Sequence, residues 1–88
     1  MIIVTFSSYS SARTQLDEWN ILANVGSGNQ LAGIYINETE DTWAINGTSC
    51  IENGGLGRDQ IIAEVEQLPS FSVDTYDDFF NLGYTPIN

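Results

Sequence analysis

LAGIYINETEDTWAI, residues 31–45, contains two strand-like runs separated by a short polar stretch. Residues 31–36 and 42–45 are rich in β-branched and aromatic side chains, which favour an extended backbone. The polar residues between them, 37–41, have the length of a hairpin loop. The stretch therefore predicts an antiparallel β-hairpin with an acidic tip.

One strand and one helix are predicted before this hairpin. Residues 2–6 (IIVTF) are typical of a strand whose two faces are both largely covered. Several serines follow and supply candidate N-caps for a helix. Apolar residues then recur at intervals of four, three and four, which places them on one stripe of that helix: Ala12, Leu16, Trp19 and Ala23. The helix is expected to end before a glycine-containing loop at 26–29.

Two further helices are predicted after the hairpin. Asn46 and Gly47 indicate a turn, and residues 48–52 are expected to form one more short strand. A helix should follow from Asp59, with Ile61, Ile62, Val65 and Leu68 at helical spacing, until Pro69 ends it. Residues 76–82 predict a last short helix, capped by Asp74 or Thr75 and stopped at Gly83.

These elements predict an α+β fold: a small antiparallel sheet of three or four strands with two or three helices packed on one face. The length of 88 residues leaves no room for a second core, so residues 1–88 are expected to form a single compact domain. Trp19 and Trp43 are the expected aromatic anchors of the core.

The charge of the chain is strongly one-sided. Twelve carboxylates accompany only two cations, Arg13 and Arg58, and there is no Lys or His, so the formal net charge is −10. Ten of the acids and one of the arginines lie after residue 30, so that part of the chain holds nine of the ten net negative charges. A surface without Lys keeps its carboxylates free of internal ion pairs and presents a uniform negative potential to a basic partner.

The acids fall into three clusters, on the hairpin tip, the outer line of the second helix and the outer face of the last helix. With three tyrosines as aromatic anchors, they are the candidate partner-binding residues: Glu38, Glu40, Asp41, Asp59, Glu64, Glu66, Asp74, Asp77, Asp78, Tyr35, Tyr76 and Tyr84.

The composition argues against most enzymatic chemistry. Without His or Lys the chain has no side chain that titrates near neutrality and no amine for a Schiff base or a phosphate clamp. Glu38, Glu40 and Asp41 lack the spacing of a calcium-binding loop, and Cys50 has no second thiol and is expected to be packed. We therefore expect no catalytic residue, no metal site and no cofactor.

The N-terminus indicates the compartment. Met1 is followed by Ile2, Ile3 and Val4, with neither a positive region nor a cleavage site, so we expect no signal peptide, no membrane span and a cytoplasmic location. For a phage-encoded protein this would be the host cell cytoplasm. The lone Cys50 agrees with a reducing compartment.

Direct binding to nucleic acid is disfavoured, because phosphate contacts require cations. A small acidic body can instead occupy the basic groove in which another protein binds DNA or RNA. In size and charge the whole chain resembles phage-encoded counter-defence proteins, such as anti-CRISPR and anti-restriction proteins. That resemblance implies a non-enzymatic inhibitor, a nucleic-acid mimic or steric blocker, of a defence nuclease or CRISPR effector.

Two other functions are consistent with the same composition. An immunity or antitoxin protein would cap one basic toxin enzyme by the same electrostatics. A halophile-adapted structural domain would carry the acids for hydration alone, and it would need molar salt to fold. In each case the nearly neutral helix around residues 12–23 is the candidate self-contact of a homo-oligomer.

Overall fold

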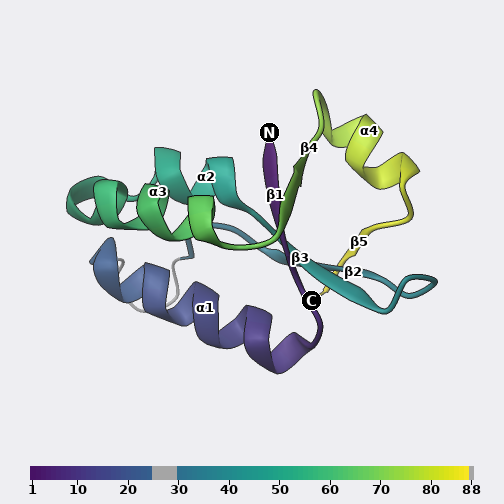
Figure 1. Ribbon diagram of the computed structural model, residues 1–88, viewed down its shortest axis with the longest axis horizontal. Helices are drawn as coiled ribbons and strands as arrows, with labels where there is room; N and C mark the ends of the chain where they lie inside the picture. Colours follow the sequence, from purple (N-terminus) through teal and green to yellow (C-terminus); the bar gives the residue numbers. More distant parts are fainter. Residues whose placement is uncertain (25–29, 88) are drawn as a thin grey trace.

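The protein is built on a five-stranded antiparallel sheet with the strand order β4-β1-β3-β2-β5 (Figure 1). The computed structural model describes residues 1–24 and 30–87, so the loop predicted at 26–29 lies outside the described residues. The strands are β1 (Ile2–Phe6), β2 (Ile34–Asn37), β3 (Thr42–Asn46), β4 (Ser70–Ser72) and β5 (Thr85–Pro86). The α+β class and the single antiparallel sheet are confirmed.

Among the described residues, five helical segments accompany the sheet. They are α1 (Tyr9–Leu22), α2 (Gly47–Glu52), the 3-10 turn η1 (Gly55–Gly57), α3 (Arg58–Gln67) and α4 (Tyr76–Asn81). The predicted serine cap of α1 is Ser8, whose side chain accepts a hydrogen bond from the Ser11 amide at 3.0 Å. The predicted hairpin is β2–β3, in which Ile34 pairs with Ile45 and Ile36 with Trp43.

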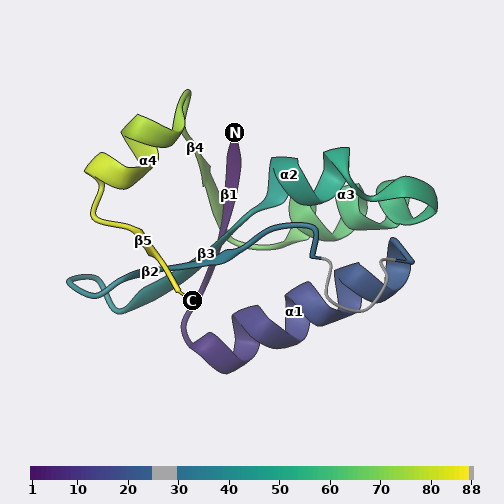
Figure 2. The same ribbon diagram turned by 180° about the vertical axis from the view of Figure 1, so that it is seen from behind.

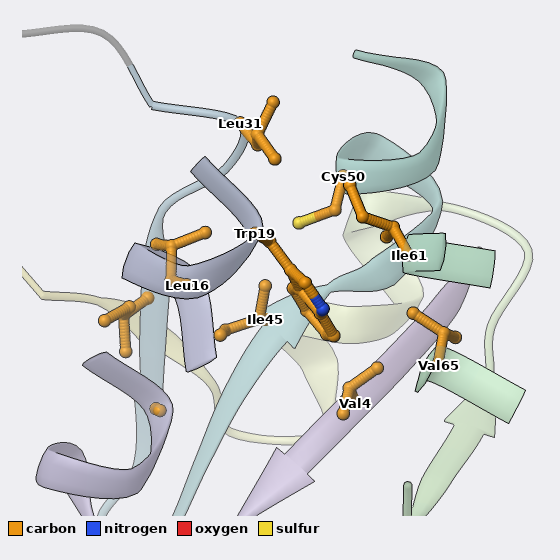
Figure 3. Packing of buried hydrophobic residues seen from close by; sticks show 10 residues of the cluster. Val4, Leu16, Trp19, Leu31, Ile45, Cys50, Ile61 and Val65 are labelled. Carbon is orange, nitrogen blue, oxygen red and sulfur yellow. The ribbon is translucent and has the colours of Figure 1, made fainter. Parts of the chain in front are cut away.

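One face of the sheet is covered by α1, α2 and α3. The indole of Trp19 lies at the centre of this layer, between Val4 and Ile45 of the sheet and Ile61 and Val65 of α3 (Figure 3). Trp19 is fully buried, and Trp43 is partly buried against the same cluster. This layer holds most of the apolar residues that the helical spacing selected.

The opposite face is covered by α4, so the helix predicted at residues 76–82 does not share the face that α1, α2 and α3 cover. Phe79 of α4 packs with Ile3 of β1, Ala44 of β3 and the buried Tyr84. The pattern of β1 explains this arrangement, because neighbouring residues point to opposite faces and both Ile3 and Val4 are fully buried. The core therefore has two layers (Figures 1 and 2).

Three short elements differ from the sequence prediction. Residues 48–52 belong to the helix α2 and not to a strand, because the Asn46 side chain accepts from the Ser49 amide at 3.1 Å and caps a helical turn. The edge strands β4 and β5 were not predicted, and they raise the strand number above the expected three or four. They have three and two residues, too few for an alternating pattern.

Candidate functional site

The hairpin tip between β2 and β3 presents three exposed acids, Glu38, Glu40 and Asp41. Its shape is fixed by the buried Asn37, whose Oδ1 accepts from the Glu40 amide at 3.1 Å. Asp41 adopts a left-handed backbone with φ of 52°, which Asp tolerates better than most residues. The predicted acidic tip is present, with its side chains toward solvent.

Asn37 also ties the hairpin tip to the end of α4. Its Nδ2 donates to the Leu82 carbonyl at 3.0 Å, just before Gly83, where the chain turns with φ of 110°. A Cβ on Gly83 would lie 3.3 Å from Nδ2 of the Asn37 side chain. Glycine at this position therefore permits both the turn and the close approach of the Asn37 side chain to the backbone. The tip and α4 therefore lie at the same end of the molecule (Figure 1).

The acids of α4 are exposed around its first turn. The predicted cap is Thr75, whose hydroxyl accepts from the Asp78 amide at 3.1 Å. Asp77 and Asp78 lie in the first turn, where carboxylates interact favourably with the helix dipole, and Asp74 precedes the cap. All three are exposed.

Aromatic rings connect α4 to the sheet. Phe79 stacks on Tyr84, with ring centroids 4.6 Å apart, and meets Tyr35 edge-on at 5.0 Å. Burial, with a smaller contribution from Glu40, raises the pKa of Tyr84. Tyr84 is only 6% exposed, so it serves the core and does not present its ring at the surface as the sequence prediction assumed.

Two predicted anchors do reach the surface. Tyr76 is 44% exposed, and Tyr35 is half-buried beneath Phe80. Phe80 itself is 43% exposed and was not selected from the sequence. A signal was present in the predicted helix 76–82. At about 100° per residue its four apolar side chains, Tyr76, Phe79, Phe80 and Leu82, span roughly 160°, so that not all of them can face the sheet at once.

The acids of the third cluster, on α3, differ in how far they are exposed. Asp59 and Glu66 are exposed, as predicted. Glu64 is half-buried, and its Oε1 accepts from Trp19 Nε1 at 3.1 Å and from Gln15 Nε2 at 3.3 Å. Its Oε2 accepts from Gln60 Nε2 at 2.8 Å. Glu64 therefore satisfies the indole of the core tryptophan, and its carboxylate is not free for a partner.

The acidic clusters lie at two ends of an elongated molecule. The principal extents are 35 × 23 × 21 Å, and the long axis separates the start of α3 from the hairpin tip and α4 (Figures 1 and 2). Two of the three predicted clusters thus lie toward the same end of the molecule, with the hairpin tip nearer to the last turn of α4 than to its acidic first turn. Asp59 of α3 lies at the other end.

The two cations do little to neutralise these surfaces. In the described part of the chain, the one ion pair joins Arg13 to Asp17 at 2.8 Å on α1, and Arg13 also donates to Gln30 Oε1 at 2.9 Å. Arg58 is exposed at the start of α3, far from α4 along the long axis. The acids near α4 therefore keep their charge.

The interior offers little reactive chemistry. Cys50 is fully buried, and burial raises the pKa of its thiol to about 12, so the nucleophilic thiolate is scarce at neutral pH. Over residues 1–24 and 30–87, no group of three His, Cys, Asp or Glu side chains is arranged to hold a metal ion. In the same residues no helix has the length and hydropathy needed to cross a membrane.

In comparisons with known proteins, no family model, curated protein or solved structure matches the chain.

Proposed function

We propose that the protein is a small acidic inhibitor that binds the basic, nucleic-acid-binding surface of a defence nuclease or CRISPR effector. The observation that carries this proposal is the presence of exposed acids on both the hairpin tip and α4, which lie toward the same end of the molecule. The formal net charge of −10 adds long-range attraction to a positive partner.

The proposed mechanism is occupation of the partner's groove. A nucleic-acid-binding surface uses Lys and Arg to neutralise phosphates, and carboxylates compete for the same cations. The inhibitor would act by binding alone, because its one thiol is buried and its composition includes no His or Lys. Mimicry of the phosphate path and simple steric blocking both give competition with DNA or RNA.

The test is displacement of nucleic acid from purified effectors. A panel of restriction nucleases and CRISPR effectors is loaded with fluorescent DNA or RNA, and anisotropy is followed as the protein is added. We expect displacement at about 50 mM salt and weaker displacement at about 500 mM, since the Debye length falls from about 14 Å to about 4 Å. Failure to displace nucleic acid from every effector at low salt would remove the proposal.

A further inference from the structure

The outer surface of α4 places two exposed aromatic rings beside exposed acids. The helix α1 has one exposed ring, Tyr9, but its exposed acids Asp17 and Glu18 lie at least eight positions, roughly 12 Å, further along the helix. On α4, Tyr76 is 44% exposed and Phe80 43%, and Leu82, the C-cap residue that follows the helix, is 53% exposed. The helix is nevertheless firmly attached to the sheet, through the buried Phe79 and the hydrogen bond from Asn46 to Tyr76. Its exposed rings are therefore held in place by neighbours and not left on a loose segment.

The rings form a preorganised stack. Tyr76 and Phe80 are four positions apart, with ring centroids 5.9 Å apart and an interplanar angle of 29°. Tyr35 supports Phe80 from the sheet at 6.0 Å, and the Tyr76 hydroxyl accepts from Asn46 Nδ2 at 2.8 Å. Rings fixed in this way lose little conformational entropy when a partner covers them.

Charge identifies the kind of side chain that suits this stack. Asp77 lies beside Tyr76 and three positions before Phe80, a spacing that places Asp77 and Phe80 on one flank of the helix. A guanidinium group is planar, stacks on aromatic faces and donates bidentately to a carboxylate. A lysine ammonium is a compact, strongly hydrated charge and gains less from the rings.

We propose that Tyr35, Tyr76 and Phe80, with Asp74 and Asp77, form the contact surface for arginine side chains of a basic protein partner. This inference rests on the proposed function and names the part of the molecule that performs it. The other end of the protein provides an internal control. Asp59 also lies in the first turn of a helix, and Leu56 is a fully exposed apolar residue nearby.

Two fluorescent peptides, octa-arginine and octa-lysine, probe the surface directly. The wild-type protein should bind octa-arginine several-fold more tightly than octa-lysine at about 50 mM salt, because arginine gains more than lysine from contact with the aromatic rings. Phe80→Leu keeps apolar bulk but removes the ring, and it should abolish most of this preference. Leu56→Ser should leave the preference unchanged.

A second pair of variants separates local contact from overall charge. Asp77→Asn and Asp59→Asn each remove one of the ten net charges and one first-turn acid. Asp77→Asn should weaken octa-arginine binding about three- to tenfold, whereas Asp59→Asn should change it less than twofold. In a ¹⁵N-labelled sample, octa-arginine should shift the amide resonances of residues 35 and 74–82.

The outcomes distinguish the two proposals. If effectors are inhibited but both peptides bind equally, or both aspartate variants lose the same affinity, the arginine surface is wrong and the inhibitor proposal survives. If neither a peptide nor any effector binds at low salt, the inhibitor proposal itself falls. A protein that sediments as a dimer, with concentration-dependent shifts at residues 74–82, would assign this surface to a second copy and overturn the inference.

Discussion

Glu64 is both a charged residue of α3 and the hydrogen-bond acceptor of a buried core residue, Trp19. Trp19 is fully buried, and an indole N–H in such a position requires an acceptor. Glu64 Oε1 supplies it at 3.1 Å, while Gln60 holds the other oxygen. One of the twelve acids thus contributes to folding as well as to the surface potential.

Replacing Glu64 should separate these two roles. Glu64→Leu leaves the Trp19 N–H without an acceptor, and we expect a loss of about 1–3 kcal/mol in the free energy of unfolding. Glu64→Gln removes the same charge but keeps a carbonyl oxygen, so its loss should be clearly smaller. Urea titrations followed by tryptophan fluorescence measure both. Equal losses would show that the charge, and not the hydrogen bond, is what matters.

Cys50 predicts a specific dependence on pH. Burial raises the pKa of its thiol to about 12 in the folded state, from an ordinary value of 9.0. The protonated thiol thus stabilises the fold fully below pH 9, and this contribution is lost as pH rises from about 9 toward 12. We expect the unfolding free energy to fall over this range, and to fall less in Cys50→Ala.

Iodoacetamide provides an independent measurement of the same thiol. Cys50 should react slowly at pH 9 in the native protein and rapidly in concentrated urea, because the thiolate is the reactive form. Rapid native labelling, or identical pH slopes for the wild type and Cys50→Ala, would contradict the buried position.

At the scale of elements, Asn46 joins three segments. It ends β3, its Oδ1 caps α2 by accepting from the Ser49 amide, and its Nδ2 donates to the Tyr76 hydroxyl on α4. It is 3% exposed, so water cannot replace these partners. Asn46, which the sequence pattern predicts to form a turn with Gly47, thus connects the two layers of the core.

Substitutions at Asn46 should show this double role. Asn46→Ala removes the cap and the bond to Tyr76, and we expect a loss of about 2–4 kcal/mol. Asn46→Asp keeps an oxygen for the cap but loses the amide donor, and it places a charge in a buried position. A control is Thr75→Ala, an exposed cap removal expected to cost about 1 kcal/mol. The idea fails if Asn46→Ala costs no more than Thr75→Ala in urea titrations.

The elements that could be predicted from the sequence are those whose apolar residues form a clear pattern. The helices α1 and α3 follow from apolar residues at helical spacing, and the hairpin from two strand-like runs around a polar loop. The edge strands β4 and β5 form by pairing with the backbone N–H and C=O groups of β1 and β2. Pairing between residues so far apart in the chain leaves no pattern in the local sequence. The helix α2 depends on the Asn46 cap, which resembles a turn signal equally well.

The candidate site could be predicted only in part, for the same reason. Exposure of Glu38, Asp59 and Asp77 follows from loop and helix patterns. The burial of Tyr84 and the position of α4 on the second face depend on contacts between residues far apart in the chain. The position of α4 beside the hairpin likewise depends on long-range contacts, namely the hydrogen bond from Asn37 to Leu82 and the packing of Tyr35 against Phe79.

At the scale of the whole molecule, charge acts on stability. A formal charge of −10 within a radius of gyration of 12.2 Å implies self-repulsion that salt relieves. The two core layers nevertheless bury large side chains on both faces of the sheet, including Trp19, Phe79 and Leu16. Burial of this kind stabilises the fold without help from salt.

We therefore expect the protein to be folded at about 0.15 M salt, with a urea midpoint that rises modestly as sodium chloride increases from about 0.05 to 0.5 M. Circular dichroism at each salt concentration measures this. A chain that folds only in molar salt would instead support a halophile-adapted domain.

The short outer strands restrict how any other protein chain attaches. An exposed sheet edge is a template for strand addition, the route by which many peptides bind and by which amyloid grows. Here the edges are β4, with three residues after Pro69, and β5, with two residues that include a proline. Neither edge offers a useful length of backbone donors and acceptors, which should keep concentrated solutions free of fibrils. A partner must then recognise this protein through its side chains and not through the backbone of an edge strand. Because a side chain can be replaced by a single mutation, such recognition can be altered one residue at a time.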